Sequence, residues 1–179
     1  MNKHIAILRG INVGGKKRIL MKDLKLLMEE LGLQNVQTYI QSGNIIFHAP
    51  TTQSKETLEQ MLETAIHKQY GFEVPVIVRQ PQELLDIVKK LPYKEHGIEH
   101  LHLTFLKTTP TAEAIDTLHQ HPKGGDLFSL LHQEVFIYCE GKYHQSKLSN
   151  QFFESRLKVK ATTRNWKTIL KLVTLSTSS

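Results

Sequence analysis

The order of its periodic segments constrains the fold of this chain more than any other feature. Apolar alternation and helical spacing in the first half predict β-α-β-β-α-β, with strands at 4–9, 36–41, 44–48 and 74–79 and helices at 22–31 and from 58 to near 71. This is the split-βαβ order, in which an antiparallel sheet carries two helices on one face. We therefore expect an α+β fold built on a ferredoxin-like unit, the α–β plait.

The second half repeats this order. A helix is expected at 81–91 and a linker-like break at 92–97. The segments that follow are a strand at 101–107, a helix at 111–121, a hairpin of 126–131 with 134–140, and helices at 146–157 and 166–172. The last helix takes the place of a fourth strand. The sequence thus predicts two ferredoxin-like units, with residues 1–91 in the first and residues 92–179 in the second.

Charge is distributed unevenly along the chain. Residues 1–20 carry a formal charge of +5 and residues 141–179 carry +7, whereas the segment between them carries −6. If the two ends meet in the fold, they form one positive patch; otherwise they are two separate solvated faces.

The composition also excludes several kinds of site. A single cysteine, Cys139, excludes an intrachain disulfide and a cysteine-based zinc site. His96, His100 and His102 are not accompanied by a metal-binding motif, so we expect no metal and no cofactor. Apolar runs are short and no signal-peptide pattern precedes the first strand, which favours a cytoplasmic location.

The segment Arg9–Arg18 is rich in glycine and cations and lies between the first strand and the first helix. Such a turn offers backbone N–H groups and positive charge to an anion. A nucleotide-binding P-loop needs Ser or Thr after its lysine, and Lys17 stands there instead. The segment is therefore either an anion nest built on Gly14, Gly15 and Lys16 or a structural glycine turn.

Three further blocks concentrate polar residues. Gln41, Ser42 and Asn44 form a hairpin tip, for which local turn chemistry is the alternative explanation. Ser146 is expected to cap a helix that has Lys147 in its first turn. A lysine at this position is unfavourable beside the positive end of the helix dipole, so either a nearby anion or solvent exposure has to account for it. The third block precedes the last helix and contains Arg164, Asn165 and Trp166; the tryptophan either packs in the core or supports a ligand.

These four blocks, in this order, resemble the bacterial domain-of-unknown-function family 1697. The residues that match are Arg9, Asn12, Gly14, Gly15, Lys16, Gln41, Ser42, Asn44, Ser146, Lys147, Arg164, Asn165 and Trp166. The resemblance implies a cytoplasmic bacterial protein made of two α–β plait-like units. It implies no reaction, cofactor or substrate.

The leading hypothesis is a binding module in which these residues form a basic polar cleft. Its ligand would be an anion: a nucleotide, a phosphorylated metabolite or a nucleic-acid backbone. Gly14 and Gly15 would allow close approach, Lys16, Lys147 and Arg164 would supply charge, and Asn12, Gln41 and Asn44 would give directional bonds. Two alternatives stay open: an enzyme acting on a small phosphorylated substrate through Lys16 or Lys147, and a protein-interaction module.

Overall fold

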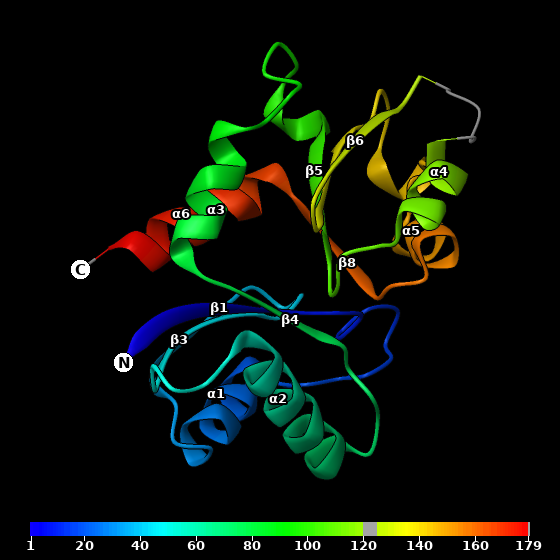
Figure 1. Ribbon diagram of the computed structural model, residues 1–179. Helices are drawn as coiled ribbons and strands as arrows, with labels where there is room; N and C mark the ends of the chain where they lie inside the picture. Colours follow the sequence, from blue (N-terminus) through cyan, green and yellow to red (C-terminus); the bar gives the residue numbers. More distant parts are fainter. Residues whose placement is uncertain (120–124, 179) are drawn as a thin grey trace. The chain divides into compact units, whose positions relative to one another are not determined.

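The computed structural model describes residues 1–119 and 125–178 (Figure 1). The chain forms two compact units. The first comprises Met1–Leu85 together with the segment from Leu172 onward, and the second comprises Asp86–Lys171. The predicted division, between residues 91 and 92, falls later in the chain than this one. Each unit holds an open, four-stranded antiparallel sheet, which confirms the α+β class.

The first unit follows the predicted order closely. Its elements are β1 (Asn2–Leu8), α1 (Met21–Glu30), β2 (Gln34–Tyr39), β3 (Asn44–Ala49), α2 (Lys55–Tyr70) and β4 (Val76–Arg79). The strands are arranged β2-β3-β1-β4, and α1 and α2 cover one face of this sheet (Figure 1). Ala6 and Phe47 from the strands pack there with Leu24 of α1 and Leu62 of α2, all four fully buried. This core forms because alternate strand residues and one side of each helix are apolar.

The edge strand β4 has its outward amides occupied by glutamates. The Val76 N–H donates to Glu63 Oε1 at 2.8 Å, and the Val78 N–H donates to Glu59 Oε1 at 2.9 Å. The next outward amide, that of Gln80, donates to Glu83 Oε2 at 2.7 Å. Free edge amides invite pairing with another strand. The carboxylates therefore close this edge of the sheet.

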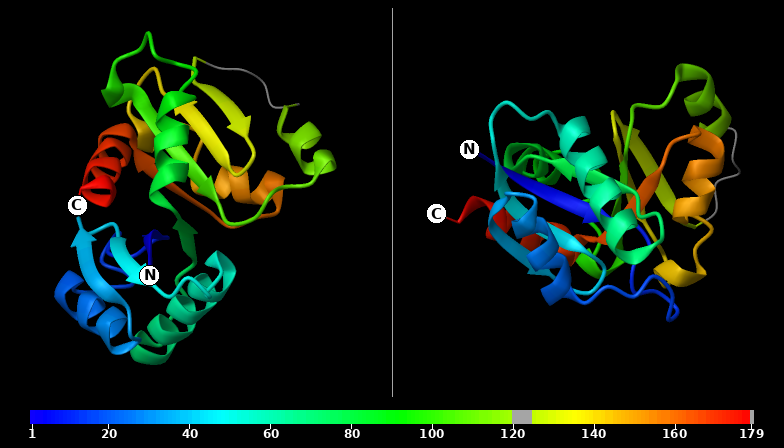
Figure 2. Two further views of the ribbon diagram at one scale, coloured as in Figure 1. Left: turned by 60° about the vertical axis from the view of Figure 1, so that its left-hand side comes forward. Right: turned by 90° about the horizontal axis from the view of Figure 1, so that it is seen from below.

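The second unit repeats the arrangement. Its elements are α3 (Pro81–Lys89), η1 (Ile98–His100), β5 (Leu101–Leu106), α4 (Ala112–His119), β6 (Leu127–Leu131), β7 (Glu134–Tyr138), η2 (Tyr143–Gln145), α5 (Asn150–Leu157), β8 (Ala161–Asn165) and α6 (Trp166–Thr177). The boundary between the units runs through α3 and α6. The strands are arranged β6-β7-β5-β8, and Figure 2 shows the hairpin β6–β7 in yellow. Leu118 of α4 and Phe153 of α5 pack with Val135 and Ile137 of β7 to form the core.

Two predictions about this unit were wrong. The segment that precedes the last helix is a strand, β8, so the fourth strand is present and α6 follows it. The sequence of β8, Ala-Thr-Thr-Arg-Asn, has almost no apolar alternation, which is why the pattern missed it. The helix expected from Ser146 begins at Asn150, and Ser149 caps it by accepting from the Phe152 N–H. The predicted end of the helix at 111–121 lies outside the described residues.

The outward edge of strand β8 is also closed by a glutamate of the same unit. Glu154 of α5 accepts the Ala161 N–H at 3.0 Å, just as the α2 glutamates do for β4. Within 1–119 and 125–178, no helix is long and apolar enough to cross a membrane.

Candidate functional site

The glycine-rich segment folds as a small β-hairpin, here called the glycine hairpin and comprising residues 10–19. Its turn is Val13–Lys16, closed by a bond from the Lys16 N–H to the Val13 carbonyl at 3.0 Å. Gly14 and Gly15 have φ of 57° and 73°, as a type I′ turn requires at both central positions. In Figure 1 the blue segment after β1 extends past the end of the sheet before it returns to α1. The glycines thus serve a turn, and the turn is exposed.

Asn12 fastens this hairpin to the first unit. Its Nδ2 donates to the carbonyls of Ile19 and Gln41, both at 2.9 Å, and its Oδ1 accepts the Ile19 N–H at 2.9 Å. Its backbone is left-handed, with φ of 56°, a conformation that asparagine tolerates better than most residues. The side chain of Asn12, which the sequence predicts to bind a ligand, therefore holds the glycine hairpin in place.

The bond from Asn12 to Gln41 brings the first two predicted blocks side by side. Beneath them, Gly43 has φ of 84°, and a Cβ on it would lie 2.7 Å from Ile11 Cδ1 and 2.8 Å from Leu8 Cβ. Asn44 is fully buried and donates to the Tyr39 carbonyl at 3.0 Å and to Ser42 Oγ at 3.3 Å. Turn chemistry thus accounts for these contacts of Ser42 and Asn44. The Gln41 side chain is exposed.

The cations of the glycine hairpin have different roles. Lys17 Nζ donates to the Glu73 carbonyl at 2.6 Å and so ties the hairpin to the segment before β4. Lys16 and Arg18 are exposed, and neither forms an ion pair within the described part of the chain. The amides of Gly14 and Gly15 likewise donate no hydrogen bond to any described residue. Lys16 and the two amides are therefore available at the turn, Arg18 is available near the end of the hairpin, and the half-buried Arg9 precedes its start.

The remaining predicted residues belong to the second unit. Ser146 Oγ donates to Asp126 Oδ2 at 2.5 Å and accepts the Leu148 N–H at 3.1 Å, so it organises the turn that leads to α5. Lys147 beside it is exposed. It precedes the helix, so the expected conflict with the helix dipole does not arise.

Arg164 and Trp166 are buried. The guanidinium Nη1 of Arg164 donates to Thr162 Oγ1 and to the Thr163 carbonyl, both at 3.0 Å. Burial lowers the pKa of Arg164 to about 10, so it stays charged at neutral pH. The Trp166 ring lies 6.3 Å from that of Phe136, and both side chains are almost fully buried.

Within this unit the side chain of Arg164 is buried, whereas that of Lys147 is exposed. Arg164 pairs with Leu103 across the sheet, on the face opposite Thr163, and Thr163 is the residue that bonds Asn150 of α5. Lys147 adjoins Leu148, which packs in the core beneath α4 and α5. The exposed Asn165 caps α6 by accepting the Thr168 N–H at 2.8 Å.

The histidines expected to be incidental contact aromatic rings. His96 stacks on Tyr138 at 3.9 Å and His102 stacks on Tyr143 at 4.5 Å between ring centroids. Burial lowers the pKa of His102, a shift that the His100 carbonyl opposes. Among the residues the structure describes, no group of three or more His, Cys, Asp or Glu side chains is placed to hold a metal ion.

Cys139 is fully buried in the core of the second unit. Burial raises the pKa of its thiol, and a hydrogen bond with Ser146 opposes the shift. The Cys139 side chain packs in this core as a small apolar residue, as the sequence predicts.

Phe47, an aromatic side chain of the first unit's sheet, is not available for stacking on a base. Phe47 lies in the core beneath the helices. On the opposite face, Ile5, Ile7 and Ile77 are apolar and fully buried. A hollow of about 440 Å³ lies along α2 beside Leu31, the residue that follows α1, and no residue of the glycine hairpin lines it.

Comparison with known proteins identifies the family of the chain. The family model described as a protein of unknown function, DUF1697, matches residues 1–136, which include the glycine hairpin and the tip at 41–44. The chain belongs to this family. The family of the resemblance is thereby confirmed.

A solved structure shows the same fold over nearly the whole chain. The conserved bacterial protein SP0830 from Streptococcus pneumoniae is 23% identical, with a TM-score of 0.78, and the match covers 97% of this chain and 98% of that one. At this identity the similarity shows the fold alone. The comparison with curated proteins gives no match.

Proposed function

We propose that this protein binds the phosphate backbone of a nucleic acid in the cytoplasm through its glycine hairpin. The observation that supports this proposal is the exposed type I′ turn at Gly14 and Gly15. The same hairpin carries the cations Lys16 and Arg18, and these two side chains and two amides lack a partner in the described part of the chain. Backbone amides and Lys or Arg side chains are the groups that most often contact phosphate oxygens.

The shape of the hairpin favours an extended polyanion over a small metabolite. Small phosphorylated ligands are usually held in concave sites where several polar groups converge. Here nothing lies within 4 Å of the position a Cβ would take on Gly14 or Gly15, and Val13 beside them is 65% exposed. A long chain of phosphates can lie across such a projection. The anchoring of the hairpin by Asn12 and Lys17 would keep the cations in a fixed arrangement.

The fold is compatible with this role. The order β-α-β-β-α-β with strands arranged β2-β3-β1-β4 supports assigning the first unit to the α–β plait. The aromatic stacking used by RNA-recognition plaits is not part of the proposal. Binding that contacts only the phosphate backbone of the nucleic acid should therefore show little preference for the base sequence. The enzyme and protein-interaction hypotheses stay predictions.

The test is fluorescence anisotropy with labelled single-stranded RNA, single-stranded DNA and duplex DNA at several salt concentrations. Affinity should fall steeply with salt, because each neutralised phosphate releases a counterion. The double variant Lys16→Ala with Arg18→Ala should weaken binding to all sequences and reduce the salt slope by about two. Lys22→Ala with Lys25→Ala, which removes two exposed cations from α1, is the control for net charge and should change affinity little.

Two results would overturn the proposal. One is wild-type protein that binds none of these nucleic acids at low salt. The other is a double variant that binds as tightly as the wild type. A nucleotide or sugar phosphate that raises the melting temperature of the wild type only, without any nucleic-acid binding, would replace the polyanion with a small ligand.

A further inference from the structure

The two edges of the sheet in the second unit differ in how they are protected. The outward Ala161 N–H of β8 is occupied by Glu154, and in the first unit the outward amides of β4 are occupied by glutamates. The other edge strand of the first unit, β2, is irregular: its register shifts between Gln34 and Gln37, and Asn35 has φ of 51°. Bulges and covered amides are the usual means by which proteins prevent edge-to-edge pairing.

Among the described residues, none supplies such a device to strand β6. Its five residues, Leu127–Leu131, include no charge and no proline, and they pair with β7 in unbroken register. A two-residue turn joins Leu131 to Glu134, and residues that flank such a turn form a hydrogen-bonded pair. Every second residue before Leu131, namely Ser129 and Leu127, therefore also bonds to β7. The backbone groups of Phe128 and Leu130 therefore point away from the sheet. Neither residue has a hydrogen-bond partner among those described.

We propose that β6 pairs antiparallel with β6 of a second copy of this chain, about a two-fold axis at Ser129. In this register the outward groups of Phe128 face those of Leu130 in the other copy. Phe128 of one copy and Leu130 of the other can then form two N–H···O hydrogen bonds, one in each direction. Leu127 lies opposite Leu131 of the other copy, so apolar residues meet apolar residues across the new pair of strands.

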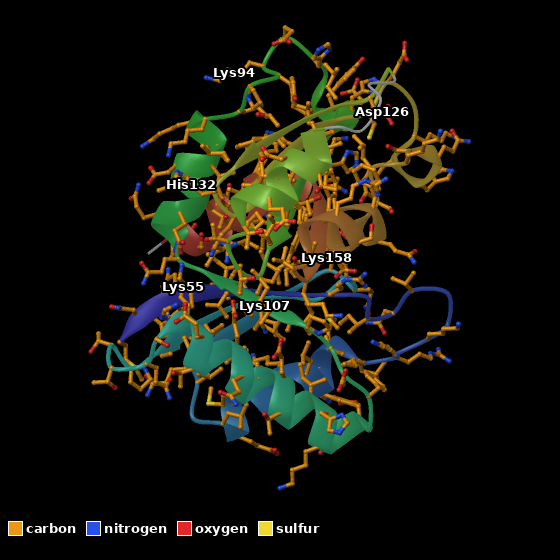
Figure 3. All side chains as sticks on the ribbon, turned by 45° about the vertical axis from the view of Figure 1, so that its right-hand side comes forward. Lys55, Lys94, Lys107, Asp126, His132 and Lys158 are labelled. Atoms are coloured by element: carbon orange, nitrogen blue, oxygen red, sulfur yellow. The ribbon has the colours of Figure 1, made fainter. Side chains whose placement is uncertain are left out.

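The charges at the two ends of β6 favour this occupant. Asp126 precedes the strand and His132 follows it, and Figure 3 shows them at its opposite ends. The two-fold arrangement places Asp126 of one copy and His132 of the other at the same end of the new strand pair. Asp126 accepts hydrogen bonds from Ser146 Oγ and the Glu140 N–H, which leaves further lone pairs for the imidazole N–H. No like charges meet along the strand.

The test is sedimentation velocity of the full chain over a wide range of concentrations. The wild type should show a concentration-dependent dimer, because one added strand pair buries a modest area. Ser129→Lys places two lysines opposite each other at the axis and should raise the dimer dissociation constant at least tenfold. Ser129→Thr, which favours a strand and adds no charge, should leave it within about threefold. Thermal melting of each variant checks that it is folded.

A second measurement tests the register. Residues at a non-hydrogen-bonded position have Cα atoms about 4.5 Å apart, within the range a disulfide spans. Ser129→Cys should therefore form a covalent dimer under oxidising conditions, and Gln151→Cys, exposed on α5, should not. A wild type that is monomeric at every concentration overturns the proposal. So does a dimer that is unaffected by Ser129→Lys, or a Ser129→Cys variant that fails to cross-link.

Discussion

The side-chain amide of Asn12 donates to the backbone carbonyl of Gln41 across 29 positions of sequence, at 2.9 Å. The same side chain makes two further bonds, both to the backbone of Ile19. One residue therefore joins the start of the glycine hairpin, its end and the neighbouring tip.

Replacing Asn12 should release the hairpin. Asn12→Gly keeps the left-handed backbone but removes three hydrogen bonds, so we expect a loss of about 2 kcal/mol in the free energy of unfolding. The Ile19 amide should also exchange with solvent faster. Asn12→Asp, which sets a carboxylate oxygen against the carbonyls of Ile19 and Gln41, should lose at least as much stability as Asn12→Gly. Unchanged exchange at Ile19 in Asn12→Gly would contradict this role.

Gly43 and Gly15 should respond differently to the same substitution. Gly43→Ala places a methyl group against Leu8 and Ile11 in a left-handed backbone, so we expect a loss of about 2–4 kcal/mol. Gly15→Ala has the backbone cost alone, about 1–2 kcal/mol, because the space around it is open. Urea unfolding measures both values. Equal losses in the two variants would show that close packing at Gly43 contributes nothing.

The glutamate that closes the β4 edge should be costly to remove. Glu59 is buried, and Glu59→Ala leaves the Val78 N–H without its acceptor, so we expect a loss of about 2–3 kcal/mol. Glu59→Gln keeps an acceptor oxygen of the same reach and should lose less than half as much. Chemical denaturation compares the two. A glutamine variant as unstable as the alanine variant would mean that the charge, rather than the hydrogen bond, is what matters.

Stability should fall as the pH drops below about 6.5 because His4 is buried. Burial lowers the pKa of His4, Glu83 opposes the shift, and His48 and Lys55 add to it. The unfolded chain takes up a proton near pH 6.5, its ordinary value, whereas the folded protein takes it up only at lower pH. The contribution of His4 is thus complete above pH 6.5 and is lost as the pH falls, by up to about 1.4 kcal/mol per pH unit.

The pH dependence separates His4 from other histidines. His4→Leu should make the free energy of unfolding less dependent on pH between 7 and 5, whatever its effect on stability at pH 7. Denaturant titrations at several pH values give the slopes. The same slope in wild type and His4→Leu would rule out His4 as the source.

The sequence predicts the helices and strands whose apolar residues recur at regular spacing on one side. It misses a strand whose place in the sheet depends on pairing with another strand far away in the sequence. Strand β3 and helix α2 were predicted because Phe47 and Leu62 lie at regular spacing in apolar patterns. Strand β8 has a mostly polar sequence, and its pairing with β5 holds it in the sheet. The start of α5 was misplaced because two serines precede it: Ser149 caps the helix and Ser146 bonds Asp126.

The same limit applies to the candidate site. Residue types indicated the glycine hairpin and its cations, because an exposed turn with positive charge is a local property. They did not distinguish Asn12, whose side chain is occupied by backbone groups, from Gln41, whose side chain is exposed. They also did not reveal that Arg164 is buried, since that depends on the register of β8 beside β5.

The buried thiol of Cys139 has a practical consequence. Thiolates react with maleimides and thiols do not, and both burial and a raised pKa keep this side chain protonated. The native protein should therefore stay unlabelled at neutral pH. Fluorophores or spin labels attached to cysteines introduced at the glycine hairpin or along β6 will then report on those places alone, with the natural residue left in its core.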